Sequence, residues 1–330
     1  MRIFKILHSP LPNADALSRV TVYRWNPMGM KRDKKPLENL MKKLNQLLGV
    51  ALMLCSLNFA RAAPLVPLAE QTPPTLQVPH VETPPRLGAD EAIWAKGALI
   101  SSLGLAQGEA SAGLKPVPTQ VRLLWSKTGL YVSFRCQDNA VFTPEKGRDA
   151  PIWKGDVVEV FLDVKGDARQ WIELEVSPNG DLFDQMATLT ATPQSNENRV
   201  LKDEVLSRDW WTDLSWNLEN WQVNARKNLP VQTTQTSNSL NAWRVDMRIP
   251  PDALRRLGVS EFKPMTMRLN LIRYKYLPTG DTKNPRRLLA MNWAPVMFGC
   301  PHISPEAMGF VQLMPPVTAA TKPTTNTISP

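Results

Sequence analysis

The sequence predicts an all-β fold, a single antiparallel β-sandwich of immunoglobulin or jelly-roll type with one short helix. Three observations predict it. The chain has 330 residues, 43% of them hydrophobic, which is enough to bury one large core. Short runs of alternating apolar and polar residues recur along most of its length. Clusters of Gly, Pro, Asn and Asp separate these runs, as is typical of a sandwich.

Each strand is expected where such a run lies between two turn signals. One short helix is expected at 252–257, because Pro250 and Pro251 open it and Gly258 stops it. No internal repeat and no second linker interrupt the run of strands, so one domain is expected. The expected strands are 121–125, 130–136, 156–164, 168–177, 181–187, 221–226, 242–249, 265–276, 288–293 and 310–313.

The hairpin around the turn Lys165-Gly166-Asp167 has the sharpest alternation. Its aliphatic residues form one face, and its carboxylates and aromatic rings form the other. Directly opposed residues in such a hairpin have Cβ atoms roughly 5 Å apart. A hairpin centred on Gly166 pairs Glu159 with Glu173, Phe161 with Trp171, and Asp163 with Arg169. The aliphatic face consists of Val158, Val160, Leu162, Ile172, Leu174 and Val176.

Two glutamates facing each other need an explanation, because like charges across paired strands are unfavourable. One interpretation is structural: cations on neighbouring strands, Arg135, Arg268 or Arg273, neutralise the pair. A second is a polar, concave sheet face that binds a hydroxyl-rich ligand, since carboxylates accept hydrogen bonds and flat rings pack on pyranose rings. A third is a glycosidase acid/base pair. All three remain open from the sequence.

The basic charge of the chain lies at its N-terminus and does not indicate a nucleic-acid partner. Residues 1–62 carry 11 Lys and Arg against 3 Asp and Glu, and the remainder carries 28 against 27. Residues 41–62 contain two lysines, an apolar run and Ala60-Arg61-Ala62, the layout of a secretory signal peptide. The run is too short to prefer a permanent membrane span. We therefore expect cleavage near Ala62, a periplasmic or extracellular protein, and no stable span after cleavage.

The chain is expected to divide into a signal, a linker and one folded domain. The segments are a spurious extension at 1–40 before a true start at Met41, the signal peptide at 41–62, a Pro-rich linker at 63–83, the β-sandwich at 84–314 and a disordered tail at 315–330. The compartment beyond the inner membrane is oxidising. There Cys136 and Cys300 either pair or remain two separate buried thiols.

Motifs spread along the domain resemble one family. The stretch 152–163, IWKGDVVEVFLD, resembles the W-x-x-D-x-V-E-x-F-x-D signature of the family 9 carbohydrate-binding modules and their DOMON-like relatives. Segments at 90–94, 130–138, 173–180, 292–295 and 301–310 resemble the other motifs of that family in the same order. The resemblance runs from about Pro84 to Leu313.

This resemblance implies a non-catalytic sandwich that holds a sugar between two tryptophans. By motif, Trp153 is one stacking wall and Glu159 accepts hydrogen bonds from sugar hydroxyls. Trp293 is the expected opposing wall, and Glu173 and Trp171 complete the expected ligand contacts. The alternatives are an edge-capping loop position for Trp153 and core packing for Trp293. Such modules accompany glycosyl hydrolases, so the resemblance also implies carbohydrate catabolism. The chain then either works alone as a sugar-binding protein or acts with a separate glycoside hydrolase as partner.

No cofactor is firmly expected. Some members of the family hold structural calcium, for which Asp138, Asp149 and Asp156 are the candidate ligands. Some DOMON-like sandwiches hold haem, which makes electron transfer an alternative function. Its candidate ligands are Met186, Met265, Met267 and His302, although Met at alternate strand positions is more often core filler. The Trp-rich segment 210–216, ahead of Trp221, is either a further ligand wall or a strand edge.

Overall fold

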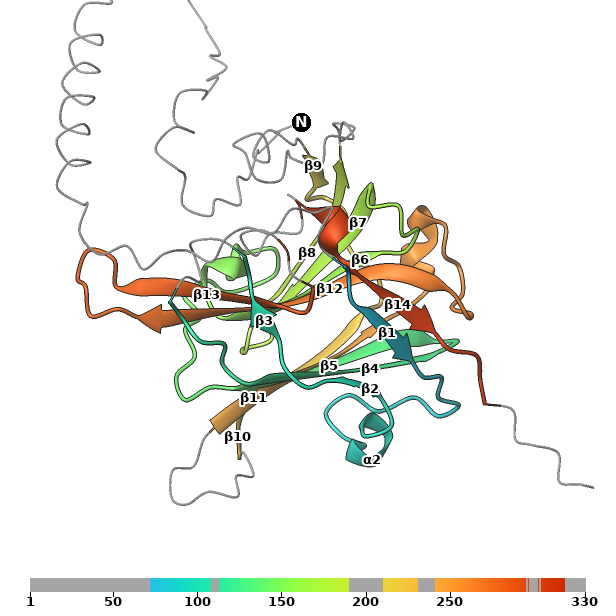
Figure 1. Ribbon diagram of the computed structural model, residues 1–330, viewed down its shortest axis with the longest axis horizontal. Helices are drawn as coiled ribbons and strands as arrows, with labels where there is room; N and C mark the ends of the chain where they lie inside the picture. Colours follow the sequence, from blue (N-terminus) through green and yellow to red (C-terminus); the bar gives the residue numbers. More distant parts are fainter. Residues whose placement is uncertain are drawn as a thin grey trace, which may run out of the picture. The chain divides into compact units, whose positions relative to one another are not determined.

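A computed structural model describes residues 72–107, 113–189, 210–230, 241–294, 296, 302 and 304–317. In this part the chain forms two β-sheets that pack face to face, which confirms the predicted all-β sandwich (Figure 1). The expected N-terminal extension, the signal peptide, the start of the linker, Cys300 and most of the tail lie outside the described residues.

The first sheet has nine strands in the order β1-β14-β12-β6-β7-β8-β9, with β13 paired to β12 and β3 paired to β13. Strand β12 is long enough for β14 and β13 to pair with successive parts of one edge, while β6 pairs with the other. The strands are β1 Thr75–Val78, β3 Gly104–Leu105, β6 Val157–Asp163, β7 Gln170–Val176, β8 Leu182–Leu189, β9 Trp210–Asp213, β12 Thr266–Pro278, β13 Arg286–Asn292 and β14 Gly309–Leu313.

The second sheet has five antiparallel strands in the order β10-β11-β5-β4-β2. They are β2 Ala98–Ile100, β4 Thr119–Ser126, β5 Gly129–Gln137, β10 Gln222–Pro230 and β11 Asn241–Ile249. The described helical segments are short: α2 Glu91–Trp94 and the 3-10 helices η4 Ile152–Lys154, η7 Asp252–Leu257 and η8 Pro305–Ala307. The helix expected at 252–257 is therefore present as a 3-10 helix, which Gly258 ends at φ 88°.

The core lies between the two sheets. The aliphatic face of the β6–β7 hairpin packs there against β4, β5 and β11, through residues such as Leu123, Phe134 and Val245. Each fully buried side chain of this kind stabilises the fold by roughly 1.5–3 kcal/mol. Cys136 on β5 is buried in the same core without a disulfide partner among the described residues, and burial raises the pKa of its thiol to about 12.

The register of the β6–β7 hairpin differs from the expected one by two residues. Glu159 lies opposite Glu175, and Phe161 lies opposite Glu173. The connection is longer than a tight turn because the Asp163 carboxylate accepts hydrogen bonds from the backbone N–H groups of Lys165, Gly166 and Ala168, at 3.0, 2.8 and 2.7 Å. A shift of two residues keeps every side chain on its predicted face, since the period of a strand is two.

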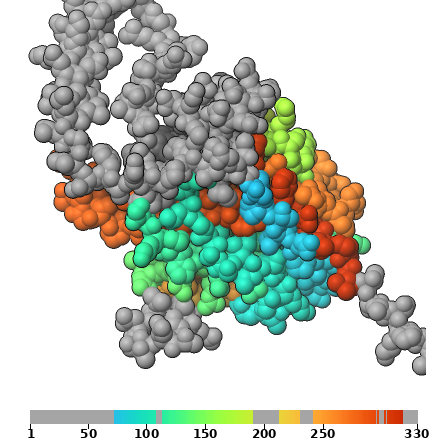
Figure 2. Space-filling model, viewed as in Figure 1, coloured from blue at the N-terminus to red at the C-terminus, as the bar shows by residue number. Residues whose placement is uncertain are grey.

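The domain also begins earlier than predicted. Residues 75–78 fall in the expected linker, yet they form β1, which pairs in parallel with β14. Figure 2 shows the blue β1 region beside the red C-terminal strand on the surface. Val78 and Val81 are buried, so this part of the Pro-rich segment belongs to the sandwich. Helix α2 and strands β2 and β3 were not predicted, because each has four residues or fewer.

Candidate functional site

A row of side chains crosses five strands on the outer face of the nine-stranded sheet, the face that points away from the second sheet. Paired positions place Asn292 on β13, Ile272 on β12, Glu159 on β6, Glu175 on β7 and Phe183 on β8 in one line. Residues paired across neighbouring strands share a face, so these five side chains lie side by side. We call this set the acidic row.

The acidic row is buried, in contrast to the open concave face expected from the sequence. Glu159 is 2% exposed, Glu175 is 0% exposed and Asn292 is 1% exposed. One end of the face is covered by a small apolar cluster to which Phe161, Trp171 and Met308 belong, because Met308, directly before β14, packs there.

Five polar atoms of the acidic row have no hydrogen-bond partner among the described residues. They are Oε1 of Glu159, both carboxylate oxygens of Glu175, and Oδ1 and Nδ2 of Asn292. A buried polar atom without a partner costs about 1–3 kcal/mol. Such atoms are rare in folded proteins, and each calls for an explanation.

Burial and mutual repulsion determine the protonation of the row. Burial, followed by the charge of Glu173, raises the pKa of Glu159 well above its ordinary value. Burial, followed by the charges of Glu159 and Glu173, does the same for the pKa of Glu175. Both shifts favour the protonated form of these carboxyl groups. Burial and the nearby carboxylates also raise the pKa of Tyr276 to about 12.

Glu173 lies two residues before Glu175 on β7, on the same face, and it has hydrogen-bond partners. It accepts hydrogen bonds from Gln185 on β8 and from Nε2 of His302 at 3.0 Å. Trp171 Nε1 donates to Nδ1 of His302 at 3.2 Å. Because Nδ1 accepts, the imidazole proton is assigned to Nε2, which donates to Glu173. This chain of hydrogen bonds fixes Glu173, whereas no N–H donor among the described residues meets Oε1 of Glu159 or the two carboxyl oxygens of Glu175.

Trp153 lies beside Phe183, at the end of the row. Its half-buried ring meets the Phe183 ring edge-on, with centroids 4.9 Å apart. The Tyr276 hydroxyl donates to the Trp153 carbonyl at 3.0 Å. Glu159 and Glu173 thus lie on the outer face of one sheet, and Trp153 in η4 packs against Phe183 of the same face.

Trp293 and Trp171 occupy other surroundings. Trp293 packs partly buried against the sandwich core, with its ring so close to Gly309 that a Cβ there would lie 2.6 Å from Cζ3. Trp171 is on the outer face but fully buried, with its indole N–H bound to His302. Neither ring opposes Trp153 in the described structure, so core packing, the alternative raised for Trp293, agrees with its position.

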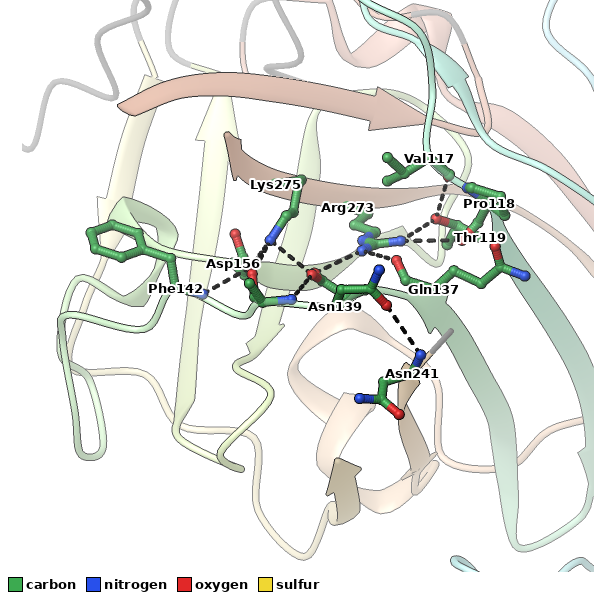
Figure 3. A network of polar contacts seen from close by, with 12 residues as sticks. Val117, Pro118, Thr119, Gln137, Asn139, Phe142, Asp156, Asn241, Arg273 and Lys275 are labelled. Atoms are coloured by element: carbon green, nitrogen blue, oxygen red, sulfur yellow. Dashed lines mark hydrogen bonds and ion pairs between the residues drawn. The ribbon is translucent and has the colours of Figure 1, made fainter. Parts of the chain in front are cut away.

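Ion pairs between the sheets hold the loop that leads to Trp153 (Figure 3). Lys275 Nζ lies 2.7 Å from Asp156 Oδ2 and 3.0 Å from Asp138 Oδ1. Arg273 lies 3.1 Å from Asp138 and also binds Thr119. Asp156 in addition accepts the backbone N–H groups of Phe142 and Tyr276 at 2.9 and 2.7 Å.

The three aspartates proposed as calcium ligands do not form a cation site. The Lys275 ammonium group lies between Asp138 and Asp156, where a metal ion would have to bind. Asp149 instead pairs with Arg148 at 3.1 Å. No group of three or more potential metal ligands occurs among the described residues.

The haem ligands considered from the sequence are also engaged. Both ring nitrogens of His302 are hydrogen-bonded, and Met267 is fully buried in the main core. Met186 and Met265 pack against that core as well. These side chains do not fit an axial ligand set.

The cations expected to neutralise the glutamates have other partners. Arg273 lies on the inner side of β12, where it binds Asp138. Arg268 lies on the outer face at the far end, where it donates to the carbonyls of Gly166, Glu306 and Met308. Arg135 is on β5 of the second sheet. No ion pair to Glu159 or Glu175 forms within the described residues.

The structure agrees with the strand-edge interpretation of the Trp-rich segment 210–216. Its first residues form β9, the last strand of the nine-stranded sheet, and Trp216 is buried in the main core. Trp221 lies near Arg148, 5.9 Å from its guanidinium carbon.

Sequence reasoning did not select Glu175, Asn292 or Gln185 as site residues. The alternation of β7 placed Glu175 on the correct face, and Asn292 lies in the closing motif, so both carried a signal. His302 was considered only as a haem ligand.

Comparisons with known proteins agree with the predicted resemblance. Residues 88–177 match the model of the family described as carbohydrate family 9 binding domain-like. This segment contains Trp153, Glu159, Glu173 and Glu175. No curated protein matches the sequence. None of the described helices combines the length and apolar composition that crossing a membrane requires.

Similar solved structures include the following three. A candidate carbohydrate-binding protein from Bacteroides uniformis ATCC 8492 is 16% identical, with a TM-score of 0.49, over 74% of this chain and 100% of that one. A family 9 carbohydrate-binding module from Caldicellulosiruptor kristjanssonii in complex with glucose is 14% identical, with a TM-score of 0.46, over 76% and 99%. The same module in complex with cellotriose gives 12% identity and a TM-score of 0.45, over 76% and 98%.

Proposed function

We propose that this domain binds a carbohydrate without chemical turnover, at the outer face of the nine-stranded sheet beside Trp153. The observation that carries the proposal is the set of unpartnered polar atoms on Glu159, Glu175 and Asn292. They form one line that ends at the Phe183–Trp153 ring pair.

A sugar fits the chemistry of this set better than an apolar ligand. A pyranose ring presents hydroxyl groups around its edge, which both donate and accept hydrogen bonds, and apolar C–H groups on its faces. Hydroxyl donors would satisfy the carboxylate oxygens, and the Asn292 amide could both donate and accept. Trp153 offers a ring for the apolar face. Binding would thereby remove the free-energy cost of the unpartnered buried atoms.

The family match supports the same function, because residues 88–177 include Trp153 and three glutamates of this face. We further propose that the protein is exported, on the basis of the signal-peptide layout at 41–62, and acts in the periplasm or outside the cell. There it would take part in the breakdown of a polysaccharide or glycan, together with a separate glycoside hydrolase.

The test is a glycan-binding screen on the full-length chain, followed by calorimetric titration of the best ligand. Trp153→Ala and Glu159→Gln should each weaken binding at least tenfold, by roughly 1.4 kcal/mol or more. The matched control is Glu261→Gln, an exposed glutamate remote from the row, which should bind as the wild type does. No binding to any carbohydrate by the folded wild type, or full binding by both site variants, would contradict the proposal.

A further inference from the structure

The acidic row has an unusual charge balance. Three carboxyl groups, those of Glu159, Glu173 and Glu175, lie on two adjacent strands and one face. Among the described residues, His302 binds Glu173 through Nε2. Within the described residues, Glu159 and Glu175 have no cation as partner.

The basic residues of β12 cannot supply that cation. Arg273 and Lys275 point to the inner side of the sheet, where they pair with Asp138 and Asp156. Arg268 is on the outer face, but three carbonyl groups and the Phe310 ring, 4.2 Å from its guanidinium carbon, occupy it. The fold therefore arranges its own cations away from Glu159 and Glu175.

Asn292 provides a second, independent observation at this face. Its side chain is 1% exposed, and neither amide atom has a hydrogen-bond partner. It lies in the same row, separated from Glu159 only by Ile272. The acidity of the neighbouring glutamates does not explain why the neutral Asn292 amide has no hydrogen-bond partner. A ligand that satisfies this amide must offer both a donor and an acceptor, in addition to the groups that bind the carboxyl groups.

We propose, resting on the carbohydrate-binding function above, that the sugar bound here carries a protonated amino group, as a glucosamine unit does. An ammonium group has three donors and no acceptor, which matches the acceptor-only character of ionised Glu159 and Glu175. Hydrogen bonds between ionised groups are roughly twice as strong as those between neutral groups. The hydroxyl groups of the same sugar would meet the Asn292 amide.

Binding of the sugar's ammonium group releases a proton from the carboxyl groups of Glu159 and Glu175. Burial and mutual repulsion raise the pKa values of Glu159 and Glu175, which favours their protonated form when no cation is bound. A bound cation favours the ionised carboxyl. One carboxyl proton then leaves to solvent as the ammonium group enters, and the charge of the site is conserved. The other titratable groups described on this face are Glu173, His302, Tyr274, Tyr276 and, at its far end, Asp163 and Arg268.

The experiment is calorimetric titration of the full-length chain with three ligands: glucosamine, N-acetylglucosamine and glucose. Acetylation keeps the sugar ring and removes the charge, so it is a matched ligand control. We expect glucosamine to bind at least about tenfold more tightly than N-acetylglucosamine at pH 7. Titration in two buffers of different ionisation enthalpy should detect proton release with glucosamine alone.

Glu175→Gln should abolish the preference for glucosamine, whereas Glu261→Gln should retain it. If Glu175→Gln does not fold, as judged by circular dichroism, Glu159→Gln replaces it. Equal affinity for glucosamine, N-acetylglucosamine and glucose would overturn the inference and leave the proposed function standing. Absence of binding to every sugar, charged or neutral, in this titration and in the glycan screen would instead reject the proposed function itself.

Discussion

Glu159 and Glu175 lie directly opposite each other on β6 and β7, both buried, and neither forms an ion pair within the described residues. Facing like charges in a buried position destabilise a folded protein unless at least one is protonated or a partner neutralises them. Their proximity therefore links protonation and stability at one place in the sheet.

The stability of the ligand-free protein should fall as the pH rises. The folded state holds protons on Glu159 and Glu175 above the ordinary glutamate pKa of 4.5, whereas the unfolded state releases them there. The folded state thus binds more protons, and the free energy of unfolding decreases from pH 4.5 upward until the raised pKa is passed. Chemical denaturation across this range measures the decrease. Glu175→Gln should reduce its slope, whereas an unchanged slope in this variant would contradict the assignment.

Removal of the Lys275 ammonium group, which lies between the sheets, should strongly destabilise the sandwich. Lys275→Met leaves the buried Asp156 without its cation, which costs about 3–5 kcal/mol. Denaturant unfolding should show this loss, and Lys263→Met, at an exposed lysine, should be close to neutral. A similar stability for both variants would mean that the ion pair contributes little.

A methyl group at Gly309 should disturb Trp293. The new Cβ would lie 2.6 Å from Cζ3 of Trp293 and 2.8 Å from the Pro74 carbonyl oxygen, so side chain or backbone must shift. We expect Gly309→Ala to lower the free energy of unfolding by about 1–3 kcal/mol. Gly104→Ala is the control, because the nearest atom to its Cβ would be 3.8 Å away. Equal effects of the two substitutions would argue against close packing of Trp293 at this position.

His302 should be a neutral imidazole with its proton on Nε2. Trp171 donates to Nδ1, and that acceptor role requires Nδ1 to carry no proton. Nitrogen-15 NMR at neutral pH distinguishes the two tautomers and the imidazolium form. Trp171→Phe should change the Nδ1 resonance more than that of Nε2, since only Nδ1 loses its donor. Detection of a proton on Nδ1 in the wild type would refute this hydrogen-bond chain.

The faces of the central hairpin could be predicted from the sequence, but its register could not. Alternation of β6 and β7 is a local property with period two, so Val158 and Glu159 were assigned correctly to opposite faces. The register depends on the length of the turn, and the hydrogen bonds from the turn backbone to Asp163 set that length. Such geometry leaves no periodic signal.

Contacts between distant segments were the other part that the sequence could not supply. The inward direction of Arg273 and Lys275 follows from alternation along β12, but their partners lie in the loops after β5 and before β6. Likewise, His302 meets Glu173 only because the chain returns over the outer face after β13. The apolar cluster of Phe161, Trp171 and Met308 depends on the same return of the chain.

The place of β14 between β1 and β12 has a consequence for how the chain acquires its structure. Strand β1, among the first residues of the domain, has its sheet partner in β14, nearly the whole domain later in sequence. A chain is synthesised from its N-terminus, and contacts between its ends form slowly because a long loop must close first. Strand β1 therefore cannot pair with β14 until β14 has been synthesised. The nine-stranded sheet can be completed only after synthesis has passed residue 313.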